Sequence, residues 1–322
     1  SVDTMKEAVS ESGYTSLNSY LAAYFGKGMN EKLYRSLLEK SYIASYYYEE
    51  LRDSWEYTDD EIETYYSEHK NEMDTFVYYY KYFDGAAVED DEETEEDESV
   101  SAEEAMAEAK ANAEAFAQGN VLDKFRAEGD VVESYGSAIS SSYAEWLYES
   151  DREEGDYTLL EVESGYYVVC FVSRDNNDYD MVNVRHILIS PEAVSKDDYA
   201  DDEAYQAAVE QASADAKAKA EDILQQWKDG EATEEAFAEL ADEYSSDSPE
   251  GGLYENVYKG QMLEEFNDWI FDDRKTGDTG IVETTYGYHI IYFVGYGDNY
   301  RTETAADGLR GESYDAWLEG KK

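Results

Sequence analysis

Two of the three histidines in this 322-residue chain lie inside short apolar runs that are rich in β-branched residues. His186 lies in residues 184–189 and His289 in residues 286–291, and both runs have the composition of β-strands. A single histidine in an apolar strand is usually a core residue whose hydrogen bonds are satisfied. Two neutral imidazoles that meet can instead donate to each other and to a hydroxyl, which fixes one arrangement of tautomers.

Asp247 supplies a carboxylate in the sequence between the two histidine runs. With His186 and His289 it could complete a two-histidine, one-carboxylate metal set. The sequence gives no sign of the open coordination geometry that such a site needs, so we expect neither a metal nor a cofactor. The sequence favours a serine hydrolase even less than a metal site, because the chain has no Gly-x-Ser-x-Gly elbow.

The segment between the histidine runs contains a helical pattern, a Gly251-Gly252 turn, and residues 260–266, which read Gly-Gln-Met-Leu-Glu-Glu-Phe. Met262 and Phe266 are four residues apart, a spacing that is also typical of an ordinary helix core. In this order, the histidines, the glycine turn and the Gly-Gln-Met motif together resemble the parvulin family of peptidyl-prolyl cis/trans isomerases. The resemblance implies that X-Pro peptide bonds are the substrate.

The resemblance also implies a role for each matched polar residue. In parvulins, two histidines face each other on adjacent strands at the floor of a proline-binding cleft, and His186 and His289 match them. Thr284 matches a threonine that is hydrogen-bonded to this pair. Asp247 matches a position that holds Cys or Asp, where a carboxylate near the rotating carbonyl would disfavour the planar amide by repulsion.

Parvulins grip the proline ring in an apolar slot made by a Met and a Phe that follow a Gly-Gln pair. Gln261, Met262 and Phe266 match this motif with the same spacing. One departure precedes it, because residues 251–257 read Gly-Gly-Leu-Tyr-Glu-Asn-Val where the family usually has Gly-Gly-Asp-Leu-Gly. We expect Leu253 or Tyr254 to close the wall of the slot, and the rate or substrate preference to differ from that of typical members.

Rotation about an X-Pro bond needs no nucleophile and no cofactor, because its barrier of about 18–20 kcal/mol comes from amide resonance. An enzyme needs only to favour the twisted state, with an apolar slot for the ring and hydrogen-bonding groups near the carbonyl. Lys259 is the only cation immediately beside the predicted slot in the sequence. We therefore do not expect a strongly phosphate-directed enzyme.

The composition excludes several classes of partner. A formal net charge of -53 and a pI near 4.1 exclude nucleic acid, because phosphate binding needs Lys and Arg, and they disfavour an anionic membrane surface for the same reason. The 33 tyrosines argue against disorder, and their buried rings offset the self-repulsion of the acidic chain. The sequence has no apolar run of about 18 residues, so we expect no transmembrane segment.

The strongest sign of domain organisation is an internal repeat. An aromatic residue, a Trp, an Arg, a Gly-Asp pair and a Gly-Tyr pair recur in the same order in residues 143–169 and 266–291. The first copy has Tyr167 where the second has His289, and it has tyrosines where the second has His186. We therefore predict an α+β protein with two tandem parvulin-like domains, each an antiparallel sheet wrapped by helices, of which the first is degenerate.

These patterns divide the chain into predicted segments. Residues 1–74 form a helical, chaperone-like region, which an amphipathic helix at 300–322 completes. Residues 75–178 form the degenerate parvulin-like domain, in which the acidic run 89–98 is a solvated loop whose carboxylates could bind calcium weakly. Residues 179–299 form the isomerase domain.

Helices at both chain ends around parvulin modules resemble the PrsA and SurA type of extracytoplasmic foldase. The resemblance implies a secreted or surface-anchored protein of a Gram-positive cell that binds unfolded or partly folded exported polypeptides containing X-Pro bonds. The sequence begins at Ser1 without an initiator methionine, so we expect a leader and a possible lipid anchor upstream. The alternative is a non-catalytic, client-binding chaperone or scaffold whose parvulin domains are architectural.

Overall fold

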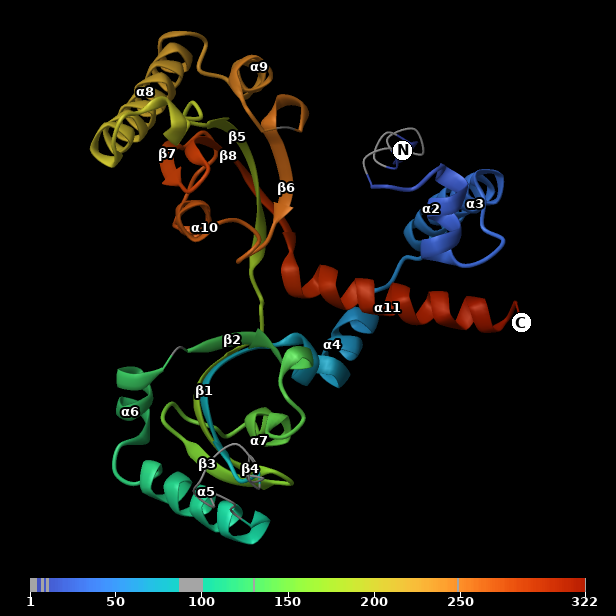
Figure 1. Ribbon diagram of the computed structural model, residues 1–322, viewed down its shortest axis with the longest axis vertical. Coiled ribbons are helices and arrows are strands. Elements are labelled where there is room, and N and C mark those ends of the chain that lie inside the picture. Colours follow the sequence, from blue (N-terminus) through green and yellow to red (C-terminus); the bar gives the residue numbers. More distant parts are fainter. Residues whose placement is uncertain are drawn as a thin grey trace. The chain divides into compact units, whose positions relative to one another are not determined.

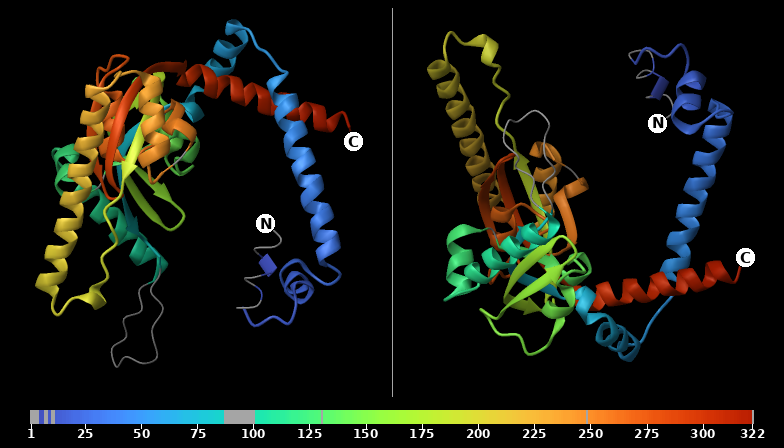
Figure 2. Two further views of the ribbon diagram at one scale, coloured as in Figure 1. Left: turned by 90° about the horizontal axis from the view of Figure 1, so that it is seen from above. Right: turned by 60° about the horizontal axis from the view of Figure 1, so that its bottom comes forward.

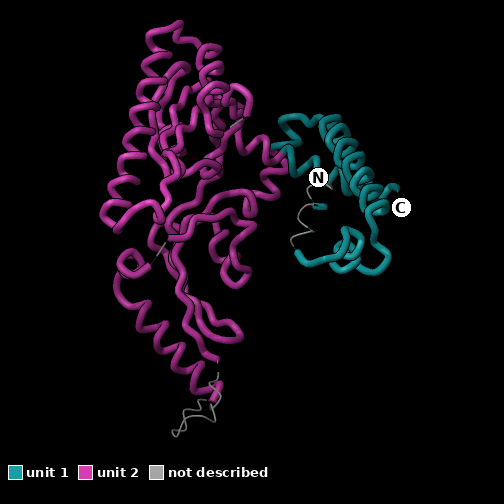
Figure 3. The backbone as a smooth tube through the Cα atoms, turned by 45° about the horizontal axis from the view of Figure 1, so that its top comes forward, with its two compact units in different colours: residues 1–62, 306–322 teal, residues 63–305 magenta. Residues whose placement is uncertain are grey.

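The computed structural model describes the chain apart from residues 1–4, 7, 8, 10, 11, 87–100, 130, 248 and 322. The acidic run 89–98 therefore lies outside the described residues. The chain divides into two units, residues 1–62 with 306–322 and residues 63–305, which Figure 3 shows in different colours. Within the described ranges, no helix is both long enough and apolar enough to cross a membrane.

The first unit is helical. It consists of α2 (Leu17–Phe25), α3 (Glu31–Asp53), the start of α4 (Asp59–Met73) and most of α11 (Tyr300–Glu319). The C-terminal helix packs on α3, where the ring centroids of Tyr48 and Tyr314 are 4.7 Å apart and meet edge to face. No side chain of α3 is fully buried in the structure, so this long helix keeps much of its apolar surface accessible.

The second unit contains two four-stranded antiparallel sheets with the same topology. The first sheet has the order β2-β1-β4-β3 and the second β6-β5-β8-β7, so each strand of the first copy has a counterpart four strands later. The strands are β1 (Thr75–Asp84), β2 (Val132–Tyr135), β3 (Tyr157–Val162), β4 (Gly165–Asp175), β5 (Asp180–Ile189), β6 (Leu253–Val257), β7 (Thr279–Thr284) and β8 (Gly287–Asn299). The predicted α+β fold with repeated antiparallel sheets is confirmed.

Helices cover both faces of each sheet (Figure 1). One face of the first sheet packs against α5 (Ala102–Phe116) and α6 (Val121–Glu128), and the other against α7 (Ala144–Tyr148). In the second sheet, α8 (Asp202–Asp229) and α9 (Glu234–Tyr244) cover one face and α10 (Glu264–Phe271) covers the other. Figure 2 shows α8 running alongside its sheet. Single turns of 3-10 helix lie at Gly136–Ala138, Lys196–Asp198 and Glu250–Gly252.

The alternation of side chains along β8 decides which residues face α10. Ile290 and Tyr292 enter the core beneath α8 and α9, whereas Ile291 and Phe293 enter the core beneath α10. Because successive side chains of a strand point to opposite faces, His289 shares the α10 face with Ile291 and Phe293.

The two copies share side-chain contacts as well as topology. The Arg152 guanidinium lies 4.1 Å from the centroid of the Trp146 ring, and its Nε donates to the Trp146 carbonyl at 3.0 Å. In the second copy, Arg274 lies 4.3 Å from the Trp269 ring, and its Nε donates to the Trp269 carbonyl at 2.8 Å. The Trp and Arg positions of the sequence repeat are therefore structurally equivalent.

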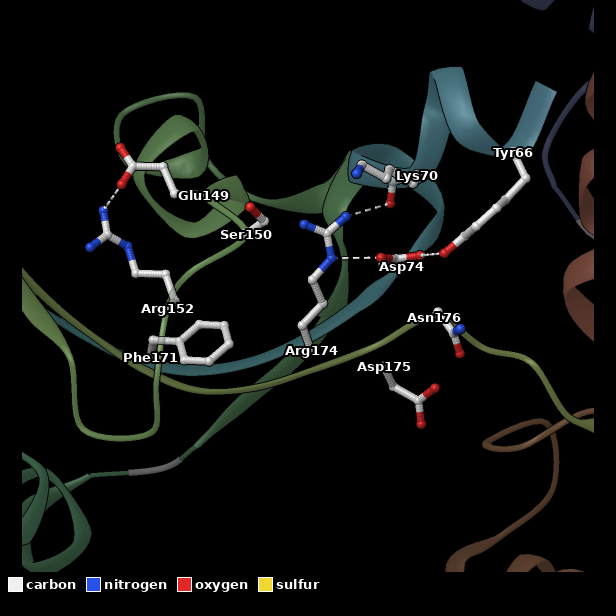
Figure 4. A pocket seen from close by; sticks show the side chains of 10 residues that line it. All are labelled: Tyr66, Lys70, Asp74, Glu149, Ser150, Arg152, Phe171, Arg174, Asp175 and Asn176. Atoms are coloured by element: carbon white, nitrogen blue, oxygen red, sulfur yellow. Dashed lines mark hydrogen bonds and ion pairs between the residues drawn. The ribbon is translucent and has the colours of Figure 1, made fainter. Parts of the chain in front are cut away.

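A buried ion pair joins α4 to the first sheet (Figure 4). Asp74, between α4 and β1, is only 3% exposed, and its Oδ2 accepts from Arg174 Nε at 2.6 Å. The Tyr66 hydroxyl donates to the other carboxylate oxygen at 2.8 Å. Arg174 also donates to the Tyr148 carbonyl at 3.1 Å and to the Asn71 side chain at 3.0 Å. These residues lie beside a cavity of about 620 Å³ and fix how α4 meets the sheet.

Candidate active site

The two histidines of the second copy meet on adjacent strands. In the antiparallel register, His289 of β8 lies opposite Leu188 of β5, and His186 lies opposite Ile291. The histidines are therefore diagonal neighbours on one face of the sheet. Their Nδ1 atoms are 3.4 Å apart and their ring centroids 5.2 Å, and the two residues are 4% and 7% exposed.

Thr284 and Asp247 lie at opposite ends of this pair. Thr284 Oγ1 is 2.8 Å from His289 Nε2, and Asp247 Oδ2 is 3.6 Å from His186 Nε2. One tautomer arrangement suits every contact: the Thr284 hydroxyl donates to His289 Nε2, His289 Nδ1–H donates to His186 Nδ1, and His186 Nε2–H points toward the carboxylate. The reverse arrangement would aim a bare nitrogen lone pair of His186 at Asp247.

Burial keeps both imidazoles neutral at pH 7. It lowers the pKa of His186 to about 4, to which His289 contributes as the next cause, while the Asp247 carboxylate opposes the shift. Burial also lowers the pKa of His289. The Tyr254 hydroxyl donates to Asp247 Oδ2 at 3.2 Å, and burial together with this carboxylate raises the pKa of Tyr254 to about 12. Among the described residues that line the cavity, Asp247 is thus the only charged one.

An apolar cavity of about 470 Å³ opens above the histidines. Phe266, at the start of α10, is 2% exposed, and its ring centroid lies 5.3 Å from each imidazole with near-perpendicular planes. Met262 lines the cavity and packs against the same core. The three rings and the Met side chain form a concave, mostly apolar surface of a size that suits small cyclic side chains.

The segment before α10 is shaped by its own polar groups. Gln261 lines the cavity, and its side-chain oxygen accepts from the Tyr258 backbone N–H at 3.0 Å. Gly260 has φ of +83°, which favours glycine, and its N–H donates to the Asn267 side chain at 2.7 Å. Gln261 therefore holds the turn that presents Met262 as well as lining the cavity.

The structure distinguishes between the two candidates for the wall. Tyr254 lines the cavity and lies 4.9 Å from His186 between ring centroids, whereas Leu253 is outside the lining and pairs with Arg185 of β5. Neighbouring residues of a strand face opposite sides, so only one of the two can close the slot. The prediction that Leu253 contributes to the slot is therefore wrong, because its side of β6 does not face the cavity.

Two further residues line the cavity that the motif did not single out, Leu263 and Tyr286. Tyr286 lies in the turn between β7 and β8 and is 63% exposed. Its backbone N–H donates to Thr284 Oγ1 at 3.2 Å. The sequence signal that could have predicted Tyr286 is its position as an aromatic residue two places after the matched Thr284. Thr284 itself lies outside the lining and holds His289 from the side.

The first copy has tyrosines at the equivalent positions. Tyr167 pairs with Tyr82 as His289 pairs with Leu188, which places Tyr80 at the position of His186. Tyr143 takes the place of Phe266. The ring centroids of Tyr80, Tyr143 and Tyr167 are 5.3 to 6.2 Å apart, so three phenols replace the two imidazoles and the phenyl ring.

The metal alternative is not supported by the donor geometry. Among the residues that the structure describes, no group of three or more His, Cys, Asp or Glu side chains could hold a metal ion. The paired Nδ1 atoms of the two histidines face each other rather than a shared point, and each can be satisfied by the other.

Comparisons with known proteins identify the domain in which this site lies. Residues 166–295 match the family profile of the PPIC-type PPIase domain. The chain is 39% identical over 117 residues to foldase protein PrsA 1 of Listeria innocua, a match that covers 35% of this chain and 30% of that protein. The chain thus spans 30% of the length of this curated relative.

Two solved structures show a partial likeness to the chain. PrsA from Bacillus anthracis matches with 22% identity and a TM-score of 0.28, covering 42% of this chain and 53% of that one. A SurA-like chaperone of Campylobacter jejuni matches with 13% identity and a TM-score of 0.27, covering 99% of this chain and 77% of that one.

Residues 166–295 therefore form a PPIC-type domain, which is a peptidyl-prolyl isomerase domain of the parvulin type. The curated proteins that match the chain over 117 residues are PrsA foldases of Listeria.

The neutral state of His186 gives a pH dependence with a defined sign. Its pKa of about 4 lies below the unfolded value near 6.5, so protons bind more tightly to the unfolded chain. This contribution to stability is full above pH 6.5 and is lost as the pH falls toward 4. Over that window we expect the loss to approach about 3 kcal/mol. Urea unfolding of the wild type and of His186→Phe at pH 7 and pH 5 measures it.

The substituted protein lacks the titrating group, so it should lose less stability than the wild type between these pH values. Equal losses in the two proteins would show that His186 is not buried in a neutral form. His69→Gln, which leaves the pair intact, is the control and should behave like the wild type.

Proposed function

We propose that this chain is a peptidyl-prolyl cis/trans isomerase and chaperone that acts on X-Pro bonds of unfolded or partly folded exported polypeptides. One observation carries the proposal: the imidazoles of His186 and His289 lie together at the floor of an apolar cavity with Met262 and Phe266 in its wall. The match of residues 166–295 to a PPIC-type PPIase domain supports it.

In the proposed mechanism, the proline ring enters the slot and packs against Met262 and the Phe266 ring. The amide is then removed from bulk water, which weakens the hydration that favours its planar, polar form. The Asp247 carboxylate lies at the rim, where it would repel the carbonyl oxygen in the planar state. The Tyr254 hydroxyl donates to Asp247 and so holds the carboxylate in that position.

The histidines contribute shape and hydrogen bonding rather than proton transfer. Both are neutral at pH 7 because burial lowers the pKa of each. Their mutual hydrogen bond and the contact of His289 with Thr284 fix the ring positions. The floor is thereby preorganised, so little rearrangement is needed when the amide twists.

The full chain is expected to accelerate cis/trans exchange of X-Pro peptides. His289→Phe keeps a ring of similar size but loses both hydrogen bonds, so we expect kcat/KM to fall about tenfold. Tyr167→Phe is the matched control, because it changes the equivalent position of the first copy, and it should leave the rate unchanged. The measurement is a protease-coupled or exchange-NMR isomerase assay.

A wild-type chain without isomerase activity would refute the proposal. It would favour the alternative, a non-catalytic chaperone or scaffold. One observation favours client binding in either case: Tyr42, Ile43 and Tyr46 on α3 are 74%, 63% and 66% exposed. This separate role can be measured with an unfolded test protein that aggregates. The assay compares how well the wild type and the double variant Tyr42→Ser/Tyr46→Ser suppress its aggregation.

We further propose an extracytoplasmic location, at the surface of a Gram-positive cell and behind a lipid anchor. Its support is the likeness of 117 residues of the chain to PrsA 1 of Listeria.

A further inference from the structure

A second cavity continues from the proline slot. It has a volume of about 980 Å³ and shares Gly260 and Met262 with the cavity above the histidines. Its opposite wall comes from the first copy, where it includes Ser134 and Tyr135 of the edge strand β2. A polypeptide whose proline occupies the slot must leave it on both sides. The shared residues make this second cavity, the flanking groove, a path for one of those two flanks.

The flanking groove carries an excess of negative charge. Glu133, Asp175 and Glu264 line it, and Lys259 is the single cation among its described lining residues. The Lys259 ammonium lies 4.3 Å from the centroid of the Tyr179 ring, so it is already engaged with an aromatic face. A basic client side chain would meet three carboxylates here, whereas an acidic one would meet repulsion.

Fixed aromatic rings form another part of the groove. The Tyr135 and Tyr179 rings line it. Tyr300 holds both in place, because its hydroxyl is 2.7 Å from that of Tyr135 and its ring stacks on Tyr179 at 5.2 Å between centroids. The Tyr179 ring is already occupied by Tyr300 and Lys259, so the Tyr135 ring is the one that can attract a Lys or Arg side chain, with little ordering cost on binding.

We propose that the flanking groove selects proline-containing polypeptides that carry Lys or Arg beside the proline. The inference rests on the proposed isomerase function, because it specifies the substrates of the same site. Exposed carboxylates attract a cation only modestly, and salt screens the attraction. We therefore expect a preference of about tenfold in kcat/KM for Lys-flanked over Glu-flanked peptides at low ionic strength, which shrinks at high ionic strength.

The test uses the full chain and peptides with one X-Pro core, flanked by Lys, Ala or Glu on either side. Turnover is measured as kcat/KM, and binding of labelled peptides is measured separately by fluorescence anisotropy, each at low and high salt. The preference should be stronger for one flank than for the other, because only one flank enters the groove.

Two triple variants that change the net charge equally separate the groove from the general charge of the protein. The groove variant is Glu133→Gln/Asp175→Asn/Glu264→Gln. Its control neutralises exposed carboxylates that do not line the groove, Glu145→Gln/Asp268→Asn/Glu283→Gln. We expect the groove variant to lose the Lys preference and the control to keep it.

Each outcome decides the proposal. Equal turnover and binding of Lys- and Glu-flanked peptides would overturn it and leave the isomerase proposal standing. A preference that both triple variants weaken equally would also overturn it, because the whole acidic protein would then be the cause. If no peptide is turned over, the isomerase proposal fails. In that case the binding measurements still test the proposal for the groove. A Lys preference in binding that only the groove variant abolishes supports the proposal, and the absence of any preference refutes it.

Discussion

Met262→Ala is expected to lower kcat/KM for X-Pro peptides by roughly 10- to 100-fold. Met262 lines the slot above the histidines, and its side chain is the flexible part of the wall that can close on a proline ring. Burying a Met side chain contributes about 1.5–3 kcal/mol, and each 1.36 kcal/mol corresponds to a factor of about ten in rate. The measurement is a steady-state isomerase assay that resolves kcat from KM.

The division between these two constants reports when the contact forms. A loss confined to KM would mean that Met262 grips the planar and twisted amides equally, whereas a loss in kcat would mean that its contact strengthens in the twisted state. Val209→Ala on α8 is the matched control, because it shortens an apolar side chain that is 37% exposed and does not line the slot. Wild-type activity in Met262→Ala would show that proline binds elsewhere.

Much of the site could be predicted because its signals are local. The histidines lie in strand-type runs, and the resemblance to parvulins predicted that they meet; the two strands pair directly in the structure. The slot follows from a single turn and the first turn of α10, which keep Met262 and Phe266 close in the sequence. The positions of Met262 and Phe266 relative to each other therefore do not depend on how distant segments pack.

The choice between Leu253 and Tyr254 could not be made from the sequence. It depends on the register of β6 against β5, and that register shifts between Val182 and Val184. Each single-residue shift exchanges the two faces of a strand, so periodicity alone could not say which side chain enters the cavity. The tyrosines of the first copy were easier to predict from the sequence. The Trp and Arg residues of the repeat align the two copies residue by residue, so the positions equivalent to the histidines can be read directly.

The flanking groove could not be predicted for a different reason. Its walls come from two copies whose lining residues are separated in the sequence by more than a domain, as Glu133 and Glu264 are. Hydrophobic periodicity describes how each copy buries its own core, and it carries no information on which surfaces of the two copies adjoin.

The ion pair of Asp74 and Arg174 has the same long-range character and a large expected effect on stability. Asp74→Ala should lower the free energy of unfolding by about 3 kcal/mol or more, because it leaves the Arg174 guanidinium partly buried without its carboxylate. The Arg174 side chain is only 18% exposed and that of Asp74 only 4%. The loss also frees the Tyr66 hydroxyl from its acceptor. Urea unfolding followed by near-ultraviolet circular dichroism measures the change.

The matched control is an ion pair of the same sheet that water already screens. Lys81 and Glu128 are 2.7 Å apart with side chains 41% and 53% exposed, so Glu128→Ala should cost less than about 1 kcal/mol. The double change Asp74→Ala/Arg174→Leu removes both buried charges and should recover part of the loss, because the penalty of the single change is an uncompensated charge. If Asp74→Ala costs no more than Glu128→Ala, or if the double change is worse than the single one, the pair does not anchor α4 to the sheet.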